Sequence, residues 1–153
     1  MLNELFRNRE RSFWLLNVVG WGGYTVAAYL GAITHEKPDT YVAVSMAAGL
    51  IGFLITIPMR YVYRSLWNRV PWQLALGVLL VSYVAAVVWR YFHNQLYWDW
   101  VKQGYTPENF LHNLDGLTGS FYVLLCWSGL YFGIKYHRQL QEQTEQTLRA
   151  TAA

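Results

Sequence analysis

The side chains that could take part in chemistry are three histidines and four acids in the segments between the long apolar stretches. They are His35, His93, His112, Glu36, Asp99, Glu108 and Asp115. Imidazole and carboxylate groups are donors for divalent metals, and histidine titrates near neutral pH, so a metal or proton sensor is one hypothesis. Their spacing matches no known ligand pattern, however, and polar residues beside a membrane more often only solvate a surface. We therefore expect neither a metal nor a cofactor in this stretch of chain.

No motif of a known catalytic site occurs in the sequence. It has no phosphate-binding glycine loop, serine-based triad, His-Glu-x-x-His zinc motif or nucleotide fingerprint. The single cysteine, Cys126, lies within an apolar stretch, where a thiol behaves as a small buried hydrophobe. One cysteine also excludes a disulfide framework. We therefore expect no catalytic residue and no enzymatic activity within this chain.

The elements that must position these residues are long apolar segments. Of the 153 residues, 54% are hydrophobic and only 14% are charged, which is typical of a membrane protein. The apolar residues form four continuous blocks, 13–33, 41–58, 72–89 and 117–134. Each approaches the roughly 20 apolar residues that cross a bilayer, and none alternates like a barrel strand. The sequence predicts an all-α integral membrane protein, a four-transmembrane-helix bundle whose first block stays in place as a signal anchor.

Basic residues are unequally distributed among the segments outside these blocks. Nine of the twelve lie beside the start of the first block or the ends of the second and fourth: Arg7, Arg9, Arg11, Arg60, Arg64, Arg69, Lys135, Arg138 and Arg149. Because positive residues mark the cytoplasmic side, residues 1–12, a short basic and aromatic turn over 59–67, and residues 135–153 are predicted to be cytoplasmic. Topology therefore explains the net charge of +3, and we expect membrane lipids rather than nucleic acid as partners of these residues.

The opposite side is predicted to carry a short extracytoplasmic helical cap over residues 90–116. Apolar residues continue from the third block at helical spacing to about Gln103. The run Thr106-Pro107-Glu108 has the pattern of a helix start, after which Phe110, Leu111 and Leu114 are expected to face inward. The cap is therefore predicted to contain two short helices.

This cap is where we expect a stimulus to act. Its sensing candidates are His93, Trp98, Asp99, Trp100 and His112. The aromatic residues are consistent with a pocket for a lipid, a quinone or another small hydrophobic signal. An ordinary interfacial aromatic belt has more weight, because such enrichment is the default at headgroup depth.

Small residues recur at four-residue spacing in three of the blocks. They are Gly23, Ala27 and Gly31 in the first block, Ser45 with Gly49 and Ala48 with Gly52 in the second, and Gly129 with Gly133 in the fourth. Small residues let helix backbones approach closely, so we expect these faces to pack against other helices. Asn17, the one amide deep in a block, is expected to hydrogen bond to a neighbouring helix rather than to a ligand.

The fourth block passes into the polar run 135–153 without a proline, and this run is rich in strong helix formers. One helix is therefore predicted to leave the membrane and enter the cytoplasm, with Lys135, His137 and Leu140 placed to transmit a signal. Its heptad seam is mostly polar, which is too weak to hold a dimer alone but suits a switch. Because no helix stop precedes Ala153, we expect a truncation before an output domain.

Three segments of the chain, taken in their order, carry a resemblance to a known protein family. They are FWLLNVVGW at 13–21, RYVYRSL at 60–66, and CWSGLYFGIKY at 126–136 leading into QLQEQ at 139–143. Together they resemble the membrane region of LytS/AlgZ-type sensor histidine kinases, and the resemblance spans nearly the whole chain. It implies a sensor domain in the bacterial inner membrane, a homodimer, and signalling to a LytTR-type response regulator. ATP and Mg are implied only for a kinase region beyond Ala153.

The phospho-accepting histidine of that family is also implied to lie beyond Ala153. His137 lacks the surrounding motif and is not expected to be phosphorylated. The alternative hypothesis is a complete small membrane protein, such as an accessory subunit or a lipid- or quinone-binding carrier. A transporter is a weaker third hypothesis, because no block carries the buried charge expected of a coupling-ion path.

Overall fold

The computed structural model describes residues 8–153, which form four long α-helices and one 3-10 helix. In chain order these are α2 (Arg9–Thr34), α3 (Asp39–Leu66), α4 (Pro71–Trp100), η1 (Phe110–Leu114) and α5 (Leu117–Ala152). The described residues contain no β-strand. The all-helical prediction is therefore confirmed. Arg7, one of the basic residues assigned to the cytoplasmic side, lies outside the described residues.

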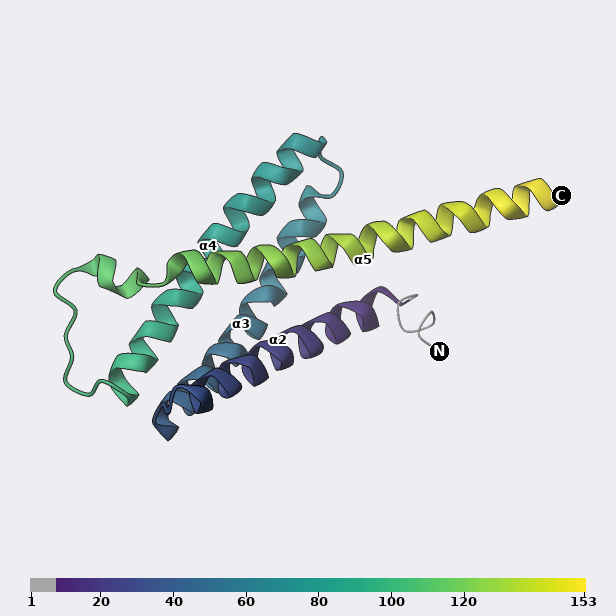
Figure 1. Cartoon of the computed structure of the whole chain (residues 1–153). Helices are drawn as coiled ribbons and strands as arrows, with labels where there is room; N and C mark the ends of the chain where they lie inside the picture. The colour runs from purple at the N-terminus through teal and green to yellow at the C-terminus, as the bar shows by residue number, and fades with distance from the viewer. Residues whose placement is uncertain (1–7) are drawn as a thin grey trace.

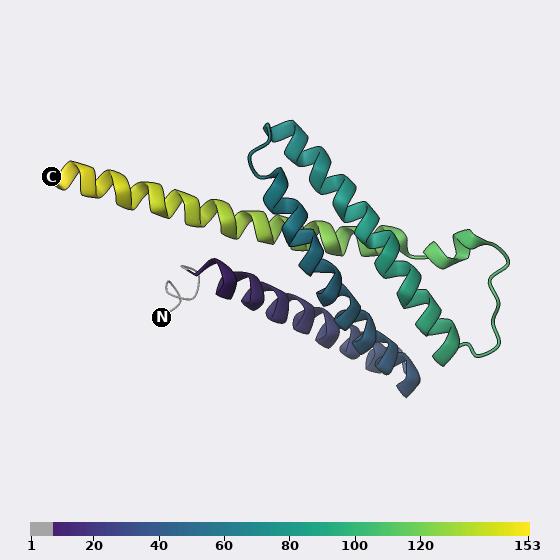
Figure 2. The same ribbon diagram turned by 180° about the vertical axis from the view of Figure 1, so that it is seen from behind.

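Helix α3 is central to the packing, because it contacts both α2 and α4, while α4 also packs against α5. The α2–α3 turn and the segment containing η1 lie toward one end of the molecule (Figures 1 and 2). The α3–α4 turn lies toward the other end, and α5 projects far beyond its neighbours on its way to the C-terminus. The core between the helices is rich in aromatic residues, including Phe13, Trp21, Tyr63, Trp89 and Trp127.

Three helical segments are long and apolar enough to cross a membrane. Among the described residues they are Asp39–Leu66, Pro71–Trp100 and Phe110–Ala152, the last of which includes η1 and α5. Helix α2 is not among them; its apolar residues are interspersed with glycine, asparagine, serine and threonine. The structure therefore supports a membrane protein with three such helices.

The basic segment after the second apolar block is helical, so the predicted turn over 59–67 is wrong. Helix α3 continues through Pro58 to Leu66. A proline inside a helix removes one hydrogen-bond donor and clashes with the preceding turn, but tertiary packing can compensate for this. Met59, Arg60 and Tyr63 follow the proline and are all buried against other helices. This packing holds the helix together and directs the Arg60 side chain into the protein.

The cap is less helical than the sequence pattern indicated. Helix α4 ends at Trp100, and no helix begins at Thr106. The 3-10 helix begins only at Phe110, where the Asn109 side chain accepts a hydrogen bond from the Leu111 amide at 3.1 Å. Phe110 and Leu111 are 65% and 72% exposed, so the expectation that they face inward is also wrong. The Asn109 side chain provides the N-cap that the sequence had assigned to Thr106, so the helix begins three residues later than predicted.

The close contact between α2 and α3 uses Gly49 and Gly52 of the second block, as their spacing predicted, and not the seam of the first block. A Cβ atom on Gly52 would overlap the Trp21 ring, and one on Gly49 would overlap the Thr25 hydroxyl. By contrast, Gly23, Gly31, Gly129 and Gly133 have no neighbouring atom within 4 Å of a Cβ position, and Ala27 is exposed. Within one chain the predicted seam therefore faces outward, and its contact with a helix of another chain stays a prediction.

Candidate functional site

A fully buried amide joins three helices at the centre of the bundle. The Asn17 Oδ1 atom accepts hydrogen bonds from the Thr56 hydroxyl at 3.0 Å and from the Trp127 indole N–H at 2.9 Å. The three residues belong to α2, α3 and α5, respectively. Buried polar groups are usually hydrogen bonded within the protein, and these two bonds connect α2 to α3 and α5, whereas the Nδ2 atom of the same amide has no partner among residues 8–153. Asn17 thus has the structural role that the sequence indicated.

A second buried group joins α3, α4 and α5. The Tyr63 hydroxyl lies 3.1 Å from the Ser82 hydroxyl and 2.6 Å from the Ser128 hydroxyl, and all three side chains are fully buried. The two serines are also 3.2 Å apart. Sequence reasoning did not single out these residues, although a serine within an apolar block is itself a signal for an interhelical hydrogen bond. Helix α5 is therefore held to the bundle by two separate polar groups.

Two asparagines that sequence reasoning also missed hold the cap. The Asn94 side chain of α4 donates to the backbone oxygens of Asn113 and Asp115, at 2.9 and 3.1 Å. Gln95 donates to the Asn113 side-chain oxygen at 2.8 Å, and Arg90 Nε donates to the Asp115 backbone oxygen. Asn94 and Asn113 are 4% and 6% exposed, which identifies them as interior linkers rather than surface residues. These bonds attach the end of α4 to the start of α5.

The five sensing candidates are distributed over the surface and the interior of the cap. Trp98 is nearly buried and its ring centre lies 5.3 Å from that of Tyr105, whereas Asp99 and Trp100 are exposed. His93 and His112 are half-buried. Across residues 8–153, no group of three or more His, Cys, Asp or Glu side chains is arranged to hold a metal ion. None of the five candidates lines the cavity described next.

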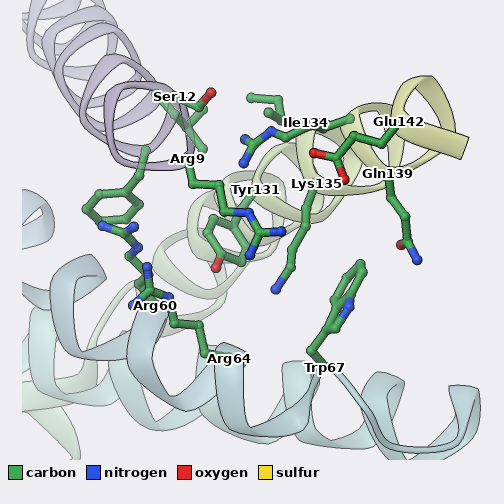
Figure 3. Close-up of a pocket in the computed structure, with 13 residues that line it drawn as sticks. Arg9, Ser12, Arg60, Arg64, Trp67, Tyr131, Ile134, Lys135, Gln139 and Glu142 are labelled. Atoms are coloured by element: carbon green, nitrogen blue, oxygen red, sulfur yellow. The ribbon is translucent and has the colours of Figure 1, made fainter. Parts of the chain in front are cut away.

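A cavity of about 590 Å³ lies between the first turns of α2, the C-terminal part of α3 and the middle of α5. It brings together the three segments that the sequence assigned to the cytoplasmic side. Its lining includes five cationic side chains, Arg9, Arg60, Arg64, Lys135 and Arg138. Figure 3 shows Arg9 and Lys135 extending into the space from α2 and α5, with Arg60 and Arg64 rising from α3. The remaining wall is largely apolar or aromatic, with Phe13, Leu16, Trp67, Tyr131 and Ile134.

Two of these cations share one carboxylate, that of Glu10. The Arg60 guanidinium donates to both Glu10 carboxylate oxygens, at 2.7 and 3.1 Å, and lies 4.2 Å from the centre of the Phe13 ring. Arg64 reaches the same carboxylate at 3.3 Å. The hydrogen bond from Arg60 is the main cause that lowers the pKa of Glu10. Arg60, which is 5% exposed, is thus fixed as part of the cavity wall.

The other three cations of the cavity have no such partner. Within residues 8–153, no salt bridge joins Arg9, Lys135 or Arg138 to a carboxylate. The Lys135 ammonium lies 4.0 Å from the centre of the Trp67 ring, and the buried Arg138 Nε has no hydrogen-bond partner among the residues that the structure describes. Lys135 directly follows the apolar block 117–134; burial and then the charge of Arg9 lower its pKa to about 8. Apart from Glu10, Glu142 is the only acidic residue at the cavity within residues 8–153.

The residues predicted to transmit a signal therefore have different environments. Lys135 lines the cavity, whereas His137 and Leu140 are exposed on the outer surface of α5. Sequence reasoning noted the other four cations only as topology markers, because the meeting of three distant segments is a tertiary property.

Comparisons with protein-family models, with curated proteins and with solved structures found no match. The function is therefore inferred from the geometry of the chain together with the three sequence segments that carry the family resemblance.

Proposed function

We propose that this chain is the transmembrane sensor and signal-transmitting domain of a bacterial two-component sensor histidine kinase. The observation that carries the proposal is α5, a single helix of 36 residues from Leu117 to Ala152. At 1.5 Å per residue it is about 54 Å long. Its first half packs within the bundle and its second half, from Gln139 onward, is exposed. Such a helix connects a membrane-embedded unit to a polar environment without a flexible joint.

The contacts of α5 support a role in relaying a change from the cap. Arg90 and Asn94 hydrogen bond to the Asp115 backbone, two residues before the helix begins. Trp127 and Ser128 then connect its middle to the other helices. A stimulus that binds one arrangement of the cap better than another shifts α5 by no more than this difference in affinity. A coupling of about 1–3 kcal/mol is typical and changes a two-state output several-fold or more.

The proposal includes four membrane spans and a homodimer. Helix α2 is the proposed fourth span, and its packing against α3 through the buried side chains of Asn17 and Trp21 supports this proposal. Both ends of the chain face the cytoplasm, in a bacterial inner membrane. The outward faces of α2 and α5, which carry Gly23, Ala27 and Gly31 and Gly129 and Gly133, are open to a second copy. A LytTR-type response regulator is the proposed receiver of the signal.

The topology predicts the location of reporter fusions. Fusions after residues 37 and 105 should report an extracytoplasmic location, because these positions lie between spans on the side poor in basic residues. A fusion after residue 66 should report a cytoplasmic location. Alkaline phosphatase and green fluorescent protein fusions at the three positions measure this directly. The opposite pattern would remove the basis for placing the cap on the sensing side.

The kinase assignment predicts ATP-dependent phosphorylation of the native full-length protein. In membrane vesicles with ATP and Mg, the protein should acquire an acid-labile phosphate on a histidine that lies beyond position 153. The variant His137→Gln should be phosphorylated normally, because the exposed His137 lacks the motif of a phospho-acceptor. Phosphopeptide mapping identifies the residue. If the native protein acquires no phosphate, the alternative of a small accessory or carrier protein is favoured.

A further inference from the structure

Among residues 8–153, the cavity described above has five cationic side chains and only two carboxylates, those of Glu10 and Glu142, to balance them. Glu10 is paired with Arg60 and Arg64. This leaves the single carboxylate of Glu142 to balance the charges of Arg9, Lys135 and Arg138. Placing like charges around a partly enclosed space costs free energy, because their mutual repulsion is less screened there than in open water. The arrangement is therefore poorly explained by topology alone, which would be satisfied by cations pointing away from one another into solvent.

We infer that this cavity binds a phosphate-bearing anion, the chemistry presented by the headgroup of an anionic phospholipid. Guanidinium groups match phosphate oxygens with paired hydrogen bonds, and a lysine ammonium adds a point charge. Arg9 and Lys135 extend into the space from two different helices (Figure 3), so an anion between them would meet donors from opposite sides. The buried, unpartnered Nε of Arg138 is a further donor in the lining.

The rest of the cavity fits an amphiphilic ligand better than a fully polar one. One wall consists of Phe13, Leu16 and Ile134, and Trp67 and Tyr131 complete it. A volume of about 590 Å³ is far more than a single phosphate group needs and lies within the range of small-molecule sites. The cavity adjoins the ends of the apolar stretches of α3 and α5, where lipid headgroups of a surrounding bilayer are found. A lipid can therefore present its phosphate to the cations and its glycerol and first methylenes to the apolar wall.

A ligand in this cavity would connect α5, the helix that extends beyond the bundle, to α2 and α3. Arg9 belongs to α2, Arg64 to α3, and Lys135 and Arg138 to α5. Neutralising these charges would remove a repulsion that pushes α5 away from α2. Binding itself does not depend on the signalling role, whereas its effect on the output of α5 rests on the proposed function.

The test measures the melting temperature of the full chain in a neutral detergent after removal of lipid. Dioleoylphosphatidylglycerol should raise the melting temperature in a concentration-dependent manner, because a ligand that binds only the folded state stabilises it, whereas zwitterionic dioleoylphosphatidylcholine should not. Inorganic phosphate is titrated in a separate arm. A shift with the lipid alone assigns a headgroup, and a shift with phosphate as well assigns a soluble phosphate compound to the same site.

Variants show whether the shift comes from the cavity. The double variant Lys135→Gln/Arg138→Gln should need about tenfold more ligand for the same shift, since two charge-assisted contacts are lost. Arg149→Gln is the matched control, because Arg149 is an exposed cation on the same helix, 3.9 Å from Glu145. It should behave like the parent protein. Arg9→Gln removes an exposed cation of a different helix and replaces the double variant if that variant elutes as an aggregate.

Two results would overturn the inference. One is an equal ligand requirement in the parent protein and in the cavity variants, which would indicate non-specific surface binding. The other is the absence of any shift with either the lipid or phosphate. Normal binding in a protein without ATP-dependent phosphorylation would leave the inference intact and remove the proposed function, so the two failures are distinguishable.

Discussion

Under the proposed function, insertion of one alanine after Gln143 is expected to lock or abolish the kinase output, whereas duplication of residues 137–143 at the same point should largely preserve regulation. One added residue rotates everything beyond it by about 100 degrees, because an α-helix has 3.6 residues per turn. Seven added residues leave a rotation of only about 20 degrees. The site follows Glu142, the last residue of α5 that lines the cavity, so both insertions leave the cavity intact.

The two insertions also separate helical phase from helix length. The duplication lengthens the helix by about 10.5 Å and the single alanine by about 1.5 Å, so a larger effect of the single alanine isolates phase. Output is measured as stimulus-dependent phosphorylation in membrane vesicles. The melting temperature of the bundle should not change in either protein, since α5 is exposed throughout the region of the insertions. Equal output with an intact stimulus response in both proteins would contradict a phase-dependent relay.

The substitution Trp89→Ala is expected to destabilise the bundle by about 3–5 kcal/mol, the usual cost of removing a large buried aromatic side chain. Trp89 is 2% exposed, and its ring centre lies 5.1 Å from that of Trp21 and 5.4 Å from that of Tyr24. Its indole N–H also donates to the Ala48 backbone oxygen at 2.8 Å. The side chain thus joins α4 to both α2 and α3, where helix association in a membrane depends on close packing.

Matched variants identify the source of this loss. Trp72→Ala removes a tryptophan of the same helix that is 63% exposed, and it should change the free energy of unfolding by less than about 0.5 kcal/mol. Trp89→Phe keeps much of the ring volume but loses the hydrogen bond, so its cost should be intermediate. Unfolding is followed by circular dichroism in mixed micelles of increasing sodium dodecyl sulfate. Equal costs for Trp72→Ala and Trp89→Ala would show that Trp89 is not part of a packed junction.

The helices could be predicted from the sequence because they form from local sequence patterns. Continuous apolar blocks favour helices in a bilayer, since every backbone group must find its partner within the segment. All four blocks, 13–33, 41–58, 72–89 and 117–134, each lie within one observed helix. The predictions failed where tertiary contacts or a side-chain cap overrode local pattern. Packing carried α3 through Pro58, and the Asn109 side chain placed the 3-10 helix at Phe110 instead of after Thr106.

The candidate site was predictable only in its parts. Basic residues next to the apolar blocks indicated which segments share one side of the membrane, because positive charge is retained in the cytoplasm. That rule assigns residues to one side of the membrane, but it does not say in which direction their side chains point. Only the packing of α2, α3 and α5 brought Arg9, Arg64 and Lys135 to one cavity. The pairing of Arg60 with Glu10, which are 50 residues apart, was equally invisible.

Which face of each helix packs against other helices was also decided only by the tertiary structure. In a soluble protein, the polar face of a helix reveals which side is buried. In a membrane helix, residues that face lipid and residues that face another helix are both apolar, so hydropathy determines that the segment is inserted but not how it is rotated. Gly23 and Gly52 both belong to small-residue patterns, yet only Gly52 lies against a neighbouring ring. The deciding factor is shape, because the Trp21 ring fits only where α3 has no side chain.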